Sequence, residues 1–274
     1  MRTVDQMVKT SRGGMIQHPL CRYHGSKWRV ASWVISHFPQ HRIYLEPFGG
    51  SASVLLRKAR CEVEIYNDLD GELVNLLRVT RDQGAALAEK IYMTPYAREE
   101  FVQAFEPADD KVEQARRTFI RAFMGFGGGY ISHSSKCARA ENGFRSSWKI
   151  HGNHANLDWL KLPDNLLLIM DRLRGVVLEN LDYRELIKRN DSPGTLVYAD
   201  PPYVAETRDR GTDYKHEFSE SDHVELAKVL HECQGPVVIS GYHSELYNDL
   251  YHDWRVSEKA TRTMQNSPGP KCSG

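Results

Sequence analysis

The chain has 274 residues, of which 41% are hydrophobic and 26% are charged, values typical of a globular protein with a buried core. No apolar run approaches the roughly 18 residues of a membrane span, and the first residues lack the apolar centre of an export signal. Five scattered cysteines fit reduced thiols. We therefore expect one large domain or two modest ones in the cytoplasm, away from any membrane.

The net charge is zero, because 36 lysines and arginines balance 36 aspartates and glutamates. Such a balance argues against a nucleic-acid partner, but the sum hides its distribution. Residues 1–44 hold seven basic and one acidic side chains, and so do residues 116–150, whereas residues 181–274 hold 11 basic and 16 acidic ones. The second basic stretch also contains aromatic residues and glycines. This distribution predicts a phosphate-binding face.

The first part of the chain alternates predicted helices and strands. Apolar spacing predicts a helix from Ser26 to His37, and the strand Ile43–Leu45 follows. Ser51 is placed to cap a helix that runs through Arg60, before a second strand, Val63–Tyr66. Short apolar runs rich in valine and isoleucine are typical of strands buried on both faces of a parallel sheet.

The middle of the chain, from about residue 82 to residue 175, contains no run of this strand type. Helical patterns cover Lys111–Met124 and Asp164–Leu173, with a glycine- and serine-rich stretch between them. The second basic stretch falls in this region. We interpret residues 82–175 as a mainly helical insertion into a domain formed by residues 1–81 and 176–274.

The alternation resumes after the insertion. Ser219 and Asp222 predict a capping box for a helix that ends before Gly235. Alternating strands and helices of this kind predict a doubly wound α/β domain. The strands expected here are Val176–Leu178, Thr195–Ala199 and Pro236–Ser240.

The most specific motif is Asp200-Pro201-Pro202-Tyr203, directly after a predicted strand. Ligands of open α/β sheets bind outside the carboxyl ends of the strands, so the motif is suitably placed. Its prolines stiffen the turn, Asp200 can accept a hydrogen bond from an amino group, and Tyr203 can stack on a base. The alternative is an ordinary turn at the end of a strand.

Three weaker motifs follow the other strands. The run Glu46-Pro47-Phe48-Gly49-Gly50-Ser51 allows a ligand to approach the backbone closely, but it is not the fingerprint of a nicotinamide dinucleotide site. Asp68 ends the second strand, where an acidic residue commonly holds ribose hydroxyls. Asp182-Tyr183 follows the third strand, and each of these aspartates could instead cap a helix. Together the motifs suit an adenosine-containing ligand next to a second flat substrate.

In this order the motifs resemble those of the Dam-like amino-group DNA adenine methyltransferases, in a form common in phages and prophages. The resemblance implies a Rossmann-like methyltransferase sheet, with residues 82–175 as an inserted target-recognition domain. It also implies methyl transfer from S-adenosylmethionine to the exocyclic amine of a flipped-out adenine in double-stranded DNA, in a bacterial or phage-infected cell. The other matching pieces are Tyr23-His24-Gly25-Ser26-Lys27, Tyr66-Asn67-Asp68, Phe123 to Gly127, Asn180 to Tyr183 and Val238 to Tyr242.

The resemblance further implies roles for single residues. Asp200 and the Pro201 carbonyl would hold the amino group of the target adenine, next to Pro202, and Tyr203 would stack on that base. Lys27 would pair with the carboxylate of S-adenosylmethionine. Asp68 would bind its ribose, and Asp182 its adenine amino group. The cofactor contacts implied are Tyr23, Lys27, Glu46, Pro47, Phe48, Gly49, Gly50, Ser51, Asp68, Asp182 and Tyr183.

The insertion supplies the expected contacts to phosphates and base edges: Arg121, Lys136, Arg139, Asn142, Arg145, Lys149 and Asn153. His133, Cys137, His151 and His154 match no firm zinc pattern, so we expect no metal site. Two alternatives stay open. One is a weak or non-catalytic DNA-binding relative, and the other is methylation of cytosine, an RNA base or a protein glutamine. The sequence specifies neither the recognition site nor a partner restriction enzyme.

Overall fold

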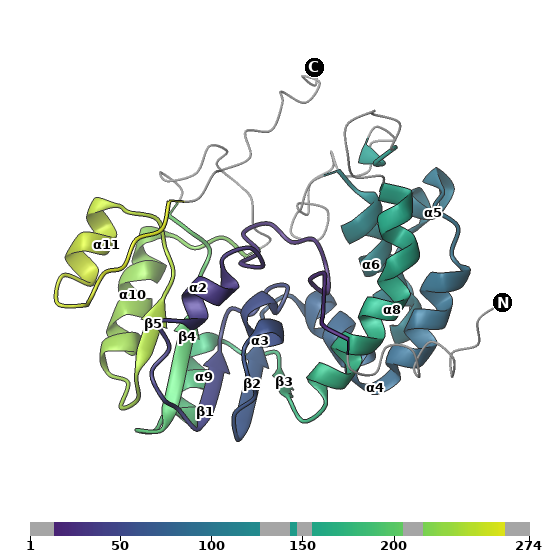
Figure 1. The fold of residues 1–274 in the computed structure, drawn as a ribbon. Coiled ribbons are helices and arrows are strands. Elements are labelled where there is room, and N and C mark those ends of the chain that lie inside the picture. Colours follow the sequence, from purple (N-terminus) through teal and green to yellow (C-terminus); the bar gives the residue numbers. More distant parts are fainter. Residues whose placement is uncertain (1–13, 127–142, 147–154, 205–215, 261–274) are drawn as a thin grey trace, which may run out of the picture.

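A five-stranded parallel sheet forms the centre of the computed structural model, which describes residues 14–126, 143–146, 155–204 and 216–260 (Figure 1). The strand order is β3-β2-β1-β4-β5, so the order reverses between β1 and β4. Ligands of doubly wound sheets bind at this switch point. The predicted α/β class and all five predicted strands are confirmed to within one residue. The strands are β1 (Ile43–Glu46), β2 (Val63–Asn67), β3 (Val177–Glu179), β4 (Thr195–Ala199) and β5 (Val237–Ile239).

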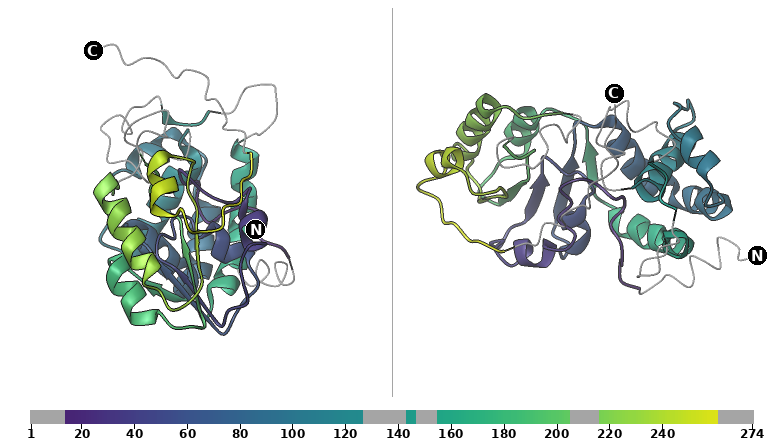
Figure 2. Two further views of the ribbon diagram at one scale, coloured as in Figure 1. Left: turned by 90° about the vertical axis from the view of Figure 1, so that its left-hand side faces the viewer. Right: turned by 90° about the horizontal axis from the view of Figure 1, so that it is seen from above.

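Helices cover both faces of the sheet, because successive residues of a strand point to opposite faces. Leu45, Val197 and Ala199 pack in one core with apolar side chains of α9 (Tyr183–Asn190) and α10 (Glu220–His231). Tyr44, Tyr66 and Tyr198 belong to the core of the other face. Figure 2 shows the sheet between these layers from two further directions. The remaining helices flanking the sheet are α2 (Ala31–Ile35), α3 (Ser53–Arg57) and α11 (Glu245–Leu250).

Four helices gather beside the sheet, on the side of β3 (Figure 1). Their apolar side chains belong to the same core as one face of the sheet. The domain boundary expected between residues 81 and 82 falls inside the first of these helices. There the backbone leaves helical geometry at Gln83 (φ −135°, ψ 27°), and Gly84 follows, packed closely on Met170. The four helices are α4 (Gly71–Met93), α5 (Arg98–Gln103), α6 (Lys111–Met124) and α8 (Ala155–Leu173).

The prediction that Ser51 caps a helix is wrong. Ala52, in the left-handed region at φ 55°, precedes α3, and no side chain caps that helix. The Ser51 hydroxyl instead donates to Ser26 Oγ and lies 2.8 Å from Ser53 Oγ. The backbone turn, rather than a capping side chain, starts α3.

Other helices begin or end at residues that differ from those predicted. The helix expected over Ser26–His37 is reduced to α2, and α8 begins nine residues before Asp164, with Pro163 inside it. The capping box at the start of α10 is confirmed, but the helix ends at His231. Gly235 serves packing instead, because a Cβ there would lie 2.0 Å from the Thr195 carbonyl oxygen. Helix α6 has the predicted bounds.

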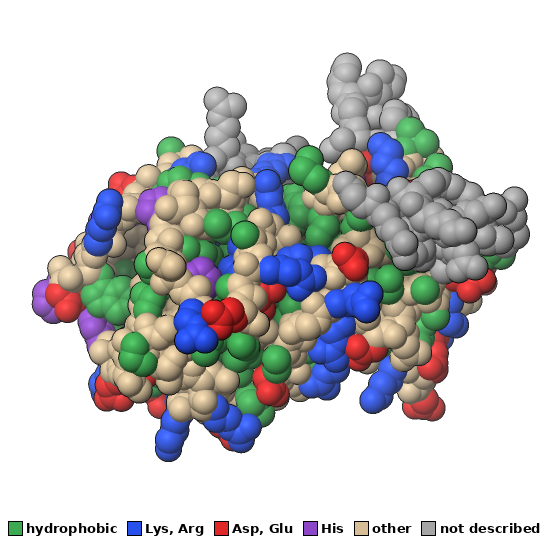
Figure 3. Space-filling view, turned by 60° about the horizontal axis from the view of Figure 1, so that its bottom comes forward, with side chains coloured by type: hydrophobic (Ala, Val, Ile, Leu, Met, Phe, Trp, Pro, Cys, Tyr) green, Lys and Arg blue, Asp and Glu red, His purple; other side chains and the backbone are tan. Residues whose placement is uncertain are grey.

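Basic and acidic side chains are interspersed on the face shown in Figure 3, where the lower side of Figure 1 is turned forward. That face therefore offers no extended surface of one sign to a polyanion. Within the described ranges, no helix has the length and apolar composition of a membrane span.

Candidate active site

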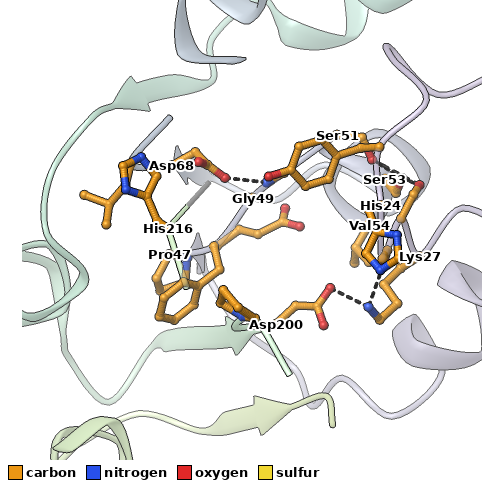
Figure 4. Close-up of a pocket in the computed structure, with 18 of the residues that line it drawn as sticks. His24, Lys27, Pro47, Gly49, Ser51, Ser53, Val54, Asp68, Asp200 and His216 are labelled. Carbon is orange, nitrogen blue, oxygen red and sulfur yellow. Dashed lines mark hydrogen bonds and ion pairs between the residues drawn. The ribbon is translucent and has the colours of Figure 1, made fainter. Parts of the chain in front are cut away.

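A pocket opens at the carboxyl ends of β1, β2 and β4, around the switch point of the sheet (Figure 4). Its volume is about 810 Å³ when the open mouth is included. Most of the residues predicted to bind a ligand meet here. The predicted residues that line it are Tyr23, Lys27, Glu46, Pro47, Phe48, Gly49, Gly50, Ser51, Asp68, Asp200 and Pro202.

The glycine turn after β1 is fixed to the end of β2. The Gly49 amide donates to the Asn67 carbonyl (2.8 Å), and the Tyr66 hydroxyl donates to the Gly50 carbonyl (2.7 Å). A Cβ on Gly49 would lie 2.0 Å from the Tyr66 ring, and Gly50 has a φ of +49°. Both positions therefore require glycine, one for close packing and one for its backbone conformation.

Asn67 is a structural residue of the site that sequence analysis did not single out. Its buried side chain donates to the carbonyls of Pro47 and Leu181 and accepts from the Leu181 amide, at 2.8–3.0 Å. These bonds join the turn after β1 to the segment after β3. The only sequence signal was its place inside Tyr66-Asn67-Asp68.

Asp68 lines the pocket and also orders its wall. One carboxylate oxygen accepts from the Gly50 amide and the other from the Asp70 amide, each at 2.8 Å. His216 also lines the pocket and lies next to Asp68 (Figure 4), although sequence analysis did not single it out.

Lys27 and Asp200 form an ion pair in the pocket, with Nζ 2.7 Å from Oδ2 (Figure 4). The Lys27 ammonium also donates to the Gly25 carbonyl (2.8 Å) and lies 4.7 Å from the centre of the Tyr203 ring. The Tyr203 hydroxyl donates to the other Asp200 oxygen at 3.2 Å. Burial raises the pKa of Asp200, and Lys27 opposes that rise. The first and last residues of the motif, Asp200 and Tyr203, thus both contact Lys27.

Glu46, the last residue of β1, is a buried carboxyl that lines the pocket. Burial raises its pKa to about 8, and the nearby Asp200 adds to the rise. Its Oε2 atom has no hydrogen-bond partner in the part of the chain that the structure describes. A buried carboxyl oxygen without a partner is an acceptor that a cationic or N–H group of a ligand could satisfy.

Three serine hydroxyls form a triangle beside Lys27. Ser26 and Ser53 lie 2.7 Å apart, and Ser51 lies 3.1 Å and 2.8 Å from them. All three line the pocket, although only Ser51 was predicted to do so. Hydroxyls can donate to a ligand carboxylate as well as to one another.

Asp182 and Tyr183 are not among the described residues that line the pocket. Asp182 caps α9, and the Arg184 guanidinium beside it lowers the pKa of its carboxyl. Tyr183 packs 5.3 Å from Phe48, and Phe218, a pocket residue that the sequence did not suggest, lies 5.7 Å from Phe48. This aromatic group closes the pocket on the side of α9.

Two of the predicted DNA contacts are described. Arg121 Nη2 lies 2.7 Å from a Glu72 oxygen and its side chain is mostly buried, so it joins α6 to α4. Arg145 follows Phe144, which pairs with Gly125 in an isolated bridge at the end of α6. Lys136, Arg139, Asn142, Lys149 and Asn153 lie outside the described residues, as do His133, Cys137, His151 and His154.

Comparison with known families agrees with this geometry. A family model described as D12 class N6 adenine-specific DNA methyltransferase matches residues 23–264. The matched region contains every strand of the sheet and every predicted pocket residue. A search of curated proteins found none that matches the chain.

Proposed function

The chain belongs to the family of D12 class N6 adenine-specific DNA methyltransferases, and we propose that its pocket binds S-adenosylmethionine beside an adenine that has left the DNA duplex. The predicted family is confirmed, and the protein is an enzyme that methylates adenine in DNA. The finer proposal concerns the methyl donor and the residues that act. When bound, S-adenosylmethionine supplies a methyl group made electrophilic by a positively charged sulfur.

The pocket residues fit the polar groups of this donor. Glu46 offers an acceptor without a partner to the amino group of the methionine portion. Lys27 and the hydroxyls of Ser26 and Ser53 offer donors to its carboxylate. Asp68 would hold the ribose hydroxyls, and Phe48 would border the adenine ring near Tyr183. In this proposal Asp182 accepts from the adenine amino group once it gives up part of its pairing with Arg184.

Asp200 carries the proposed chemistry. An adenine amino group is a poor nucleophile because its lone pair is delocalised into the ring. The Asp200 carboxylate and the Pro201 carbonyl would accept its two N–H groups and draw the nitrogen toward tetrahedral geometry, which localises the lone pair. Asp200 must first part from Lys27, and the pairing of Lys27 with the donor's carboxylate would balance that loss. Tyr203 would stack on the flipped base, whose extrusion costs a few kcal/mol.

We assign recognition of double-stranded DNA to residues 82–175 and place the enzyme in the cytoplasm of a bacterial or phage-infected cell. The basic residues concentrated in 116–150 support a DNA-facing role for part of this region. Three of these basic residues have guanidiniums that pair with carboxylates: Arg116, Arg117 and Arg121. We therefore assign the DNA-facing role to the basic residues that follow α6.

The observation that carries the proposal is the Asp200 carboxylate, which lies at the end of β4 in a pocket of cofactor size. Asp200→Ala should abolish methyl transfer to DNA while S-adenosylmethionine still binds in calorimetry. Asp253→Ala, at an exposed carboxylate shortly after α11, serves as the matched control and should keep full activity. Methyl transfer retained by Asp200→Ala would contradict the proposed mechanism.

A further inference from the structure

Arg22 is a half-buried cation at the edge of the pocket. It directly precedes Tyr23, which lines the pocket, and consecutive Cα atoms lie about 3.8 Å apart. Its guanidinium lies 5.9 Å from the centre of the Phe123 ring near the end of α6. Its nearest carboxylate is Asp158 of α8, at 3.5 Å, and 32% of the side chain remains exposed. The cation is therefore held in place and still accessible.

Arg145 belongs to another part of the chain and also lies at the end of α6. Its amide donates to the Met124 carbonyl (2.7 Å), and its carbonyl accepts from the Tyr96 hydroxyl (2.8 Å). The side chain of the preceding residue, Phe144, packs 5.3 Å from the Tyr96 ring. These contacts fix the backbone of Arg145 at the end of α6, beside Arg22.

Arg22 lies in surroundings that oppose its charge. Burial lowers the pKa of Arg22, and the charge of Arg145 lowers it further, while Asp158 only partly offsets the effect. The ion pair to Asp158 is long at 3.5 Å, whereas Arg116, Arg117 and Arg121 of α6 reach carboxylates at 2.7–3.0 Å. The surface around Arg22 and Arg145 thus holds two cations and one carboxylate, Asp158, whose ion pair is long. An added anion would relieve this repulsion.

We propose that Arg22 and Arg145 form a binding site for a backbone phosphate of the DNA, next to the pocket that takes the target adenine. Guanidinium groups suit phosphate because their N–H donors match two phosphate oxygens. Because Arg22 directly precedes Tyr23, which lines the pocket, this phosphate would belong to DNA close to the pocket. There it would hold the backbone while the base leaves the stack.

The salt dependence of DNA binding tests this site. The logarithm of the affinity for mixed-sequence double-stranded DNA should fall less steeply with the logarithm of salt in Arg22→Ala, by about 0.9 in slope for one lost phosphate contact. Between about 50 and about 200 mM salt this amounts to a roughly 3.5-fold smaller loss of affinity. Arg42→Ala is the control, because Arg42 is an exposed arginine paired with Glu62 at the amino ends of the strands, and its slope should equal that of the wild type.

Asp158→Asn gives the opposite and more decisive result, since removal of the opposing carboxylate should tighten DNA binding. A tighter complex cannot result from misfolding, so Asp158→Asn distinguishes loss of the phosphate site from a folding defect in Arg22→Ala. Arg22→Lys, which keeps the positive charge, should keep the wild-type salt slope. Wild-type salt slopes in Arg22→Ala, or weaker binding by Asp158→Asn, would overturn the proposal. So would an affinity loss confined to DNA with the methylated sequence, which would indicate a base contact. The salt slope is measured on DNA binding alone, without methyl transfer, so this result is independent of the role of Asp200.

Discussion

Replacement of Glu46 by glutamine should stabilise the protein and weaken cofactor binding at the same time. Burial raises the pKa of Glu46 from an ordinary value of 4.5 to about 8. A carboxyl group with a raised pKa in the folded state favours folding below pH 4.5, and that contribution is lost as the pH rises toward 8. At pH 7 the folded protein must hold a proton that the unfolded chain has released, at a cost of about 3 kcal/mol.

Glutamine avoids this cost because it carries no titrating proton. We expect Glu46→Gln to gain about 3 kcal/mol in free energy of unfolding at pH 7 and almost nothing near pH 4.5. In thermal melts at pH 7 this gain should appear as a rise of about 5 °C or more. Glu62→Gln is the matched control, because Glu62 is exposed and its pairing with Arg42 lowers its pKa. Its effect should not change between about pH 5 and about pH 8.

The same carboxyl should make cofactor binding depend on pH. If Glu46 must be ionised to accept the amino group of S-adenosylmethionine, the affinity of the wild type rises from about pH 6 to about pH 8. The affinity of Glu46→Gln should be lower and flat over this range in calorimetry. A stability gain in Glu46→Gln that is equal at pH 5 and pH 7, or a net destabilisation at both, would refute the reasoning.

Three further substitutions test the packing, hydrogen bonds and ion pair that surround the site. Gly49→Ala places a Cβ 2.0 Å from the Tyr66 ring, so we expect a loss of about 1–3 kcal/mol in urea unfolding and weaker cofactor binding. Asn67→Ala leaves three backbone groups without partners, the buried Pro47 carbonyl and the half-buried amide and carbonyl of Leu181, and should cost about 3 kcal/mol or more, measured in the same way. Arg121→Ala removes the pairing with Glu72 and should cost about 1–3 kcal/mol, while the salt slope of DNA binding stays at the wild-type value. An unchanged melting temperature in any of the three would contradict the packing described for it.

The sheet and its ligand-binding edge could be predicted because both depend on local patterns. Runs such as Thr195–Ala199 are mostly apolar and short, and all five residues are buried in the structure. The motifs follow the strands directly, so their meeting at one edge follows from parallel pairing alone. Helix ends were harder. Helix α8 continues through Pro163 to Ala155, and the start of α3 depends on a left-handed backbone at Ala52 rather than on Ser51.

Pairings between distant residues could not be predicted from the sequence. Lys27 and Asp200 are separated by most of the chain, and only the fold brings their charges within 2.7 Å. Arg121 belongs to a basic stretch that suggests DNA binding, yet its guanidinium donates a hydrogen bond to Glu72 of another helix. Summed charges along the sequence do not reveal such neutralisation. Nor does the sequence reveal that Glu46, an ordinary carboxyl by type, lies buried without a partner for one of its oxygens.

The central claim is that Asp200, in the pocket at the end of β4, directs methyl transfer to adenine in DNA. The most direct test expresses the wild type and Asp200→Ala at equal levels in a host without adenine methylation, and then measures modified nucleosides in the digested DNA by mass spectrometry. The account predicts N6-methyladenine with the wild type and none above background with Asp200→Ala. N6-methyladenine at wild-type levels in Asp200→Ala, or methyl groups found only on cytosine, would contradict it.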